Sequence, residues 1–157
     1  MQTLSSKQLI QVELLWWLLT ALLATLILLP IYLQVQNYPF WKTNALYIIT
    51  FVTCTRFIFL LRFTFLANRF WWKMTLIFLS IPFVFFLIQE LNGFQTYLDE
   101  QGVEAVAGLL PLKQQDAMIK YIYNEFLLFA IGAIISAFIF PFRLAVSIWR
   151  VHNRNQA

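Results

Sequence analysis

The residue with the clearest chemical implication is Arg56, which lies near the middle of an apolar segment spanning residues 45–66. A charged side chain at the centre of a bilayer is costly, so such residues usually have a specific partner or role. No carboxylate lies at a comparable depth in any apolar segment of the chain. Three arrangements remain open: hydrogen bonds within the protein, pairing with a group on another subunit, or a water-filled path that attracts anions.

The sequence offers few intramembrane partners for this arginine. Thr53 precedes Arg56 by three residues and can share its helical face. Glu90 and Glu125 lie near the ends of two other apolar segments and would have to reach inward to meet it. Polar groups inside membranes commonly hold helices together. We therefore treat Arg56, Thr53, Glu90 and Glu125 as a candidate intramembrane polar or partner site.

The remaining residues do not form the sets that catalysis or cofactor binding requires. Cys54 is the only cysteine and His152 the only histidine, so a zinc site or a haem with two histidine ligands is not expected. The chain has no glycine-rich phosphate loop and no nucleophile–base pair at membrane depth. We expect Cys54 to be a small buried apolar residue. The sequence thus predicts no catalytic residue, no metal, no cofactor and no enzymatic activity.

The elements that position these residues follow from composition. Of 157 residues, 61% are hydrophobic and only 11% are charged, whereas soluble domains carry about 25% charged residues. Four apolar stretches, at residues 14–33, 45–66, 74–91 and 126–149, approach or exceed the ~20 residues needed to span a bilayer. Their uninterrupted apolar character favours helices over a barrel. We predict an all-α membrane protein, residues 1–157 forming a single domain built as a bundle of four transmembrane helices.

The connection over residues 92–124 is the only sizeable polar region. Phe94, Tyr97 and Leu98 have helical spacing, and Val103 begins a second such pattern that Pro111 interrupts. Residues 114–116 resemble the first turn of a helix that continues into the fourth span. We predict a partly helical extracytoplasmic loop, which either caps the bundle or docks a partner.

Charge predicts the orientation of the chain. The net charge is +4, and most basic residues lie beside the N-terminus, the connection between the second and third spans, and the C-terminus. The positive-inside rule places both termini in the cytoplasm. Basic residues at this interface could form ion pairs and bind anionic lipid headgroups, and no pattern favours nucleic acid. The candidate residues for these contacts are Glu13, Arg62, Arg69, Trp71, Trp72, Lys73, Arg143 and Arg150.

The spans also differ in their packing residues. The fourth contains two pairs of small residues spaced one turn apart, which allow close helix approach: Gly132 with Ser136, and Ala133 with Ala137. The third is rich in Phe, Ile and Leu, so we expect it to face lipid or a partner.

Together these features predict a non-catalytic accessory or scaffolding subunit of a larger membrane protein complex, contacting other integral membrane subunits. The alternative is a small transporter or oligomeric channel in which Arg56 lines an anion or solute path. The absence of a mid-membrane carboxylate counts against transport. The compact layout, without a glycosylation site of the N-x-S/T type, favours a bacterial inner membrane.

Overall fold

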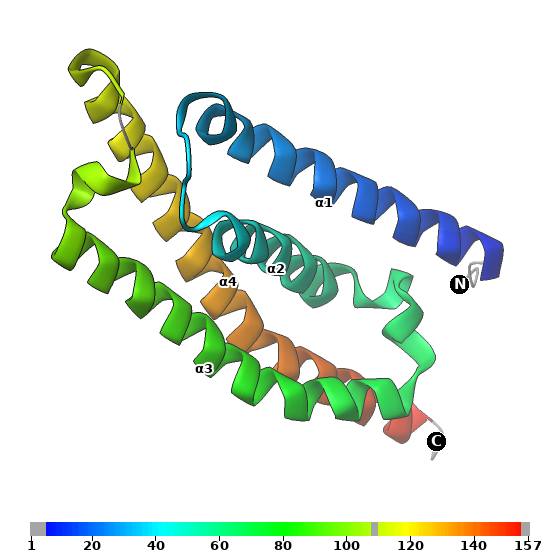
Figure 1. Ribbon diagram of the computed structural model, residues 1–157. Helices are drawn as coiled ribbons and strands as arrows, with labels where there is room; N and C mark the ends of the chain where they lie inside the picture. Colours follow the sequence, from blue (N-terminus) through cyan, green and yellow to red (C-terminus); the bar gives the residue numbers. More distant parts are fainter. Residues whose placement is uncertain (1–5, 108–109, 155–157) are drawn as a thin grey trace.

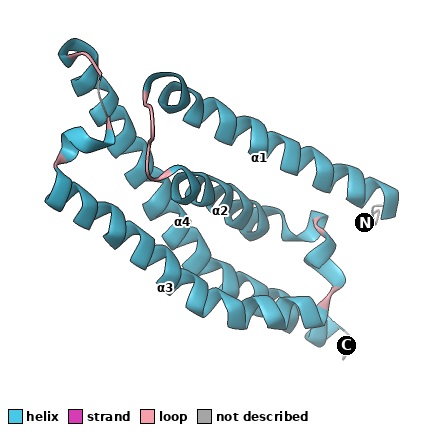
Figure 2. Ribbon diagram, in the orientation of Figure 1, coloured by secondary structure: helices cyan, strands magenta, loops and turns pink. Residues whose placement is uncertain are grey.

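The computed structural model describes residues 6–107 and 110–154, and helix is the only regular secondary structure in this part of the chain. Four helices are long and apolar enough to cross a membrane: α1 (Ser6–Gln34), α2 (Trp41–Leu60), α3 (Phe70–Gln101) and α4 (Leu112–Arg154). Short 3₁₀ turns lie in the last two connections: η1 (Leu61–Phe63) and η2 (Phe65–Asn68) between α2 and α3, and η3 (Val103–Val106) between α3 and α4. Figure 2 shows how little of the described chain is loop. The all-helical class predicted from the sequence is therefore confirmed.

The four helices run up and down, so that the first described turn of α1 and the last turn of α4 lie at the same end of the molecule (Figure 1). The connection through η1 and η2 lies at this end, which we call the terminal end. The α1–α2 connection and the η3 segment lie at the opposite end, which we call the loop end. This arrangement is the one expected for four successive crossings joined by short connections.

Two helix boundaries differ from the sequence prediction in ways that matter for the site. Helix α2 ends at Leu60, not at residue 66. Thr64 adopts an extended backbone conformation, and its hydroxyl donates a hydrogen bond to the Leu61 carbonyl, so the helix cannot continue. Arg56 therefore lies one turn from the end of α2, about 6 Å along the axis. Arg56 thus lies nearer the end of its helix than the sequence predicted.

The predicted 33-residue loop is also mostly helical. Residues 92–101 belong to α3, which ends where Gly102 adopts a positive φ of 83°. Helix α4 begins at Leu112 and runs without interruption into the fourth apolar segment, as the polar residues 114–116 indicated. Phe94 and Leu98 are buried, consistent with their helical spacing. Only the short η3 segment and its flanks connect α3 to α4.

The helices do not close into a symmetric bundle. Helix α4 makes its main contacts with α2 and α3, while α1 packs chiefly on α2. Figure 1 accordingly shows α1 at one side and α3 at the other. Aromatic rings fill the core near the loop end, where Phe94 of α3 stacks on Phe126 of α4 at 3.8 Å between ring centroids. Tyr47 of α2 meets the same Phe126 ring edge-on.

Small residues of α4 face α2. Ala133, Ser136 and Ala137 are buried. A Cβ atom on Gly132 would lie only 2.8 Å from Cδ2 of Phe51 in α2, so the glycine admits this ring. The absence of a side chain at Gly132 thus brings α2 and α4 together.

Candidate functional site

A buried ion pair joins α1 to α2 near the terminal end. Nη2 of Arg56 lies 2.7 Å from Oε1 of Glu13, and the two side chains are 5% and 16% exposed. The same Glu13 oxygen accepts a long hydrogen bond, 3.4 Å, from the backbone N–H of Phe65. Arg56 therefore has its charge partner within the chain, on a helix that the sequence analysis did not connect with it.

Aromatic rings surround the guanidinium group. Cζ of Arg56 lies 5.4 Å from the ring centroids of both Trp16 and Phe57, within the range of cation–π attraction. Trp16 follows Glu13 by three residues, so one face of α1 supplies both the carboxylate and a ring. Nε and Nη2 of Arg56 have no aligned hydrogen-bond acceptor among the described residues. The contact to Glu13 is thus a close charge pair without good hydrogen-bond alignment.

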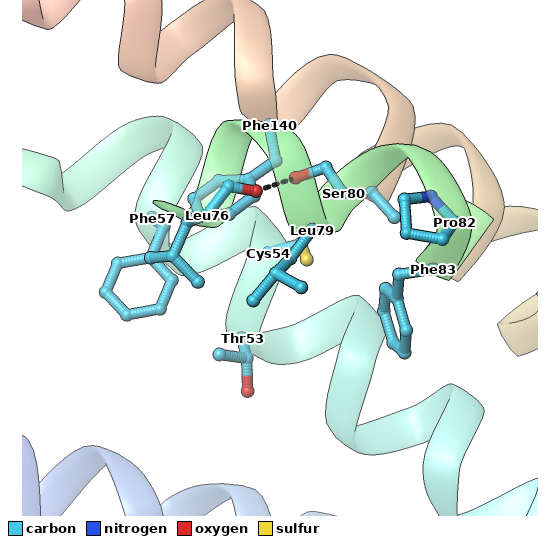
Figure 3. A pocket seen from close by; sticks show the side chains of 10 residues that line it. Thr53, Cys54, Phe57, Leu76, Leu79, Ser80, Pro82, Phe83 and Phe140 are labelled. Carbon is cyan, nitrogen blue, oxygen red and sulfur yellow. Dashed lines mark hydrogen bonds between the residues drawn. The ribbon is translucent and has the colours of Figure 1, made fainter. Parts of the chain in front are cut away.

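The structure does not bring Arg56 together with the other three residues of the predicted intramembrane site. Thr53 lines an apolar cavity formed by α2, α3 and α4 (Figure 3). Glu90 accepts a hydrogen bond from the Thr43 hydroxyl at 2.7 Å. Glu125 accepts one from Nδ2 of Asn44, also at 2.7 Å. The predicted grouping therefore does not form, because Glu90 and Glu125 contact the beginning of α2 whereas Arg56 lies near its end.

The two glutamates instead belong to a polar cluster at the loop end. Asn44 is fully buried and Glu125 nearly so, and each keeps one oxygen, Oδ1 and Oε1, without a hydrogen-bond donor among the described residues. The nearby Tyr38 hydroxyl is also buried and has no hydrogen-bond partner among the described residues. Burial raises the pKa of Tyr38, and the nearby Glu125 carboxylate raises it further. The hydroxyl therefore stays neutral. Sequence reasoning missed Asn44, because it follows Lys42 and Thr43 directly and lies just outside the predicted apolar segment 45–66.

This polar cluster links three helices. The Thr43–Glu90 contact and the bond from the Tyr47 hydroxyl to the Leu87 carbonyl join α2 to α3, and Asn44–Glu125 joins α2 to α4. Glu125 also lines an open pocket of about 450 Å³ between α4 and Ile27 of α1.

Away from the loop end, α2 and α3 separate around an apolar cavity of about 480 Å³ (Figure 3). Its lining combines small residues with aromatic rings from three helices. The hydroxyl of Ser80, its most polar α3 residue, donates to the Leu76 carbonyl of its own helix. The lining residues are Thr53, Cys54, Phe57, Leu76, Leu79, Ser80, Pro82, Phe83, Ala137 and Phe140.

The predicted cytoplasmic-interface residues divide into four groups, of which buried Lys73 is the last. Glu13 pairs with Arg56 and not with the arginines of its own interface. Arg69, Trp71 and Trp72 are exposed. Arg62, Arg143 and Arg150 line a basic pocket of about 260 Å³ between the end of α2 and the last turns of α4.

Lys73 lies next to this basic pocket and is itself buried. Its ammonium group donates to the Ala67 carbonyl at 2.7 Å and to the Ser147 hydroxyl at 3.0 Å. Nε of Arg143 donates to the Ile58 carbonyl at 2.8 Å, near the end of α2. These contacts tie the basic residues to helix ends, where carbonyl groups lack partners within the helix.

Within the described residues, no group of three or more His, Cys, Asp or Glu side chains is arranged to hold a metal ion. No protein-family model matches this sequence, and the comparisons with curated proteins and with solved structures found no similar protein.

Proposed function

We propose that this chain is a non-catalytic accessory or scaffolding subunit of a larger integral membrane complex. The observation that carries this proposal is the apolar cavity between α2 and α3. Its volume of about 480 Å³ is that of a small-molecule pocket, which has room for several side chains of a neighbouring helix. The occupant that we propose is a transmembrane helix of another subunit.

The chemistry of the lining supports a helix as the occupant. Thr53, Cys54, Ser80 and Ala137 are small, and small residues let a helix backbone approach closely. Phenylalanine rings at the edge of the cavity offer large apolar surfaces.

The exposure of α3 supports the same interpretation. Only 6% of the apolar window of α3 is buried within the protein, against 39% for α2 and for α4. Most of this bulky helix is therefore available to a partner or to lipid.

The polar groups, in contrast, are used inside the chain. Arg56 is paired with Glu13 and lines none of the apolar cavity, the Glu125 pocket or the basic pocket. The alternative of an anion or solute path along Arg56 therefore has less support than a scaffolding role.

The proposed setting is a bacterial inner membrane with both termini in the cytoplasm. Four long apolar helices support membrane integration. The terminal end gathers Arg62, Lys73, Arg143 and Arg150, which is the charge asymmetry that the positive-inside rule associates with the cytoplasm.

The test is purification of a tagged protein from its native membrane in a mild detergent, with native gels and mass spectrometry of the co-purifying proteins. A photo-crosslinking residue at Leu79, which lines the cavity and is 56% exposed, should capture a second integral membrane protein. The matched control is Leu22 of α1, which is 53% exposed and outside the cavity lining. A lone monomer or small homo-oligomer, with equal crosslinking to lipid at both positions, would overturn the proposal.

A further inference from the structure

The basic pocket at the terminal end has a composition that the accessory role does not explain. Three arginines from two segments converge on one cavity, together with a serine hydroxyl and apolar edges. The lining residues are Leu61, Arg62, Ala67, Arg143, Ser147, Arg150 and Val151. The buried Lys73 ammonium lies behind the lining, bonded to Ala67 and Ser147.

The part of the chain that the structure describes places no carboxylate against these positive charges. No carboxylate of the described residues forms an ion pair with Arg62, Arg143 or Arg150, since the glutamate of this end is engaged by Arg56. Arg143 uses Nε for the Ile58 carbonyl, so its two terminal nitrogens are not needed for this contact. Like charges at close quarters repel one another, so an anion in the pocket would relieve an unfavourable interaction.

The side-chain types indicate which anion fits. Arginine presents planar, paired N–H donors that match the oxygens of a phosphate group. A hydroxyl group such as that of Ser147 can donate to a further phosphate oxygen. A cavity of about 260 Å³ has room for a phosphate group together with some of its substituent.

We propose that this pocket binds one phosphate group, supplied by the headgroup of an anionic phospholipid or by a soluble phosphate. The lipid source follows from position, because the pocket lies where the four apolar helices end and has Leu61 and Val151 in its lining. Interfacial basic pockets between membrane helices bind anionic headgroups in this way. The site is a defined cavity and uses only some of the interface residues that the sequence predicted, since Arg69, Trp71 and Trp72 do not line it.

The experiment uses the full-length protein in a non-ionic detergent and counts bound molecules by native mass spectrometry. Three probes are added separately: short-chain phosphatidylglycerol, short-chain phosphatidylcholine and inorganic phosphate. The pocket variant is R62Q/R150Q, which spares Arg143 and its contact to α2. The control is K7Q/R69Q, which removes two exposed charges outside the pocket lining. The melting temperature of each variant confirms that it is folded.

The expected result is one saturable phosphatidylglycerol molecule per chain, weakened about tenfold or more by R62Q/R150Q and less than about twofold by K7Q/R69Q. If inorganic phosphate displaces the lipid only at much higher concentration, the headgroup is the source. Saturable binding of inorganic phosphate at equal affinity supports the same pocket with a soluble source. The proposal would be overturned if the two variants lost phosphatidylglycerol affinity equally, or if phosphatidylcholine bound as tightly as phosphatidylglycerol. So would occupation of the pocket by a carboxylate of a co-purifying subunit.

Discussion

The Glu13–Arg56 pair should behave as one energetic unit, so that removing either side chain alone destabilises the protein more than removing both. The two charged atoms lie 2.7 Å apart, and at an effective dielectric constant of about 20 their Coulomb attraction is about 6 kcal/mol. Dehydration of the two ions opposes much of this attraction. Deleting one partner of a buried pair costs about 3–5 kcal/mol, whereas replacing both with apolar residues is nearly neutral or stabilising.

The exposures of the two side chains predict an asymmetry. Glu13→Leu leaves the Arg56 charge alone at 5% exposure, so we expect a loss of about 3 kcal/mol, the lower end of that range. Arg56→Leu leaves Glu13 alone at 16% exposure, where water can reach it, so we expect about 2 kcal/mol. The double variant should lie within about 1 kcal/mol of the parent protein.

The assay is a double-mutant cycle on unfolding by sodium dodecyl sulfate in mixed micelles, followed by tryptophan fluorescence. Lys7→Leu, which removes an exposed cation from the same helix as Glu13, is the control and should have little effect. Additive effects of the two substitutions, with a double variant as unstable as their sum, would refute the reasoning. A stabilised Arg56→Leu monomer that no longer associates would assign the charge to a partner subunit instead.

Three further predictions concern packing and the loop-end cluster, and the same unfolding assay measures them. Gly132→Ala should destabilise the protein by about 1–3 kcal/mol, because its Cβ meets a phenylalanine ring at 2.8 Å; Gly93→Ala, with nothing within 4 Å, should be neutral or stabilising by up to about 1 kcal/mol. Asn44→Ala should cost about 1–3 kcal/mol, because it leaves both oxygens of the buried Glu125 without a donor. Cys54→Leu should change stability by less than about 1.5 kcal/mol, because the added carbons enter the apolar cavity. A loss of stability as large as that of Gly132→Ala would show that the cavity cannot accept the larger side chain.

Composition was enough to predict the helical class and the four long apolar helices, because apolar runs of this length have few other stable conformations. Boundaries were predicted poorly, since hydropathy follows the apolar residues and not the helix. Residues 61–66 are mostly apolar and extend the second apolar segment, yet Thr64 breaks the helix. The polar residues 92–101 and 112–124 continue α3 and α4 past the apolar segments.

The same boundary error concealed the partner of Arg56. Once α2 ends at Leu60 and α1 begins at Ser6, Glu13 and Arg56 lie at one level. Hydropathy placed Glu13 outside its span, so depth appeared to separate the two charges. The contact between Asn44 and Glu125 depends on how α2 and α4 pack, and a single sequence carries no signal for that.

The polar contacts and the apolar cavity are related consequences of folding in a bilayer. Hydrocarbon chains solvate apolar side chains about as well as a neighbouring helix does, so apolar contact alone does not close the space between two membrane helices. Directional contacts near the ends of the helices determine the separation instead. Near the terminal end, Arg143 of α4 bonds to Ile58 of α2, and Lys73 of α3 bonds to Ser147 of α4. At the loop end, Thr43 of α2 bonds to Glu90 of α3. With the ends of α2 fixed, α2 and α3 can remain apart along their middle. On this argument the cavity is a stable feature of the fold, which is the property that a docking surface for another helix requires.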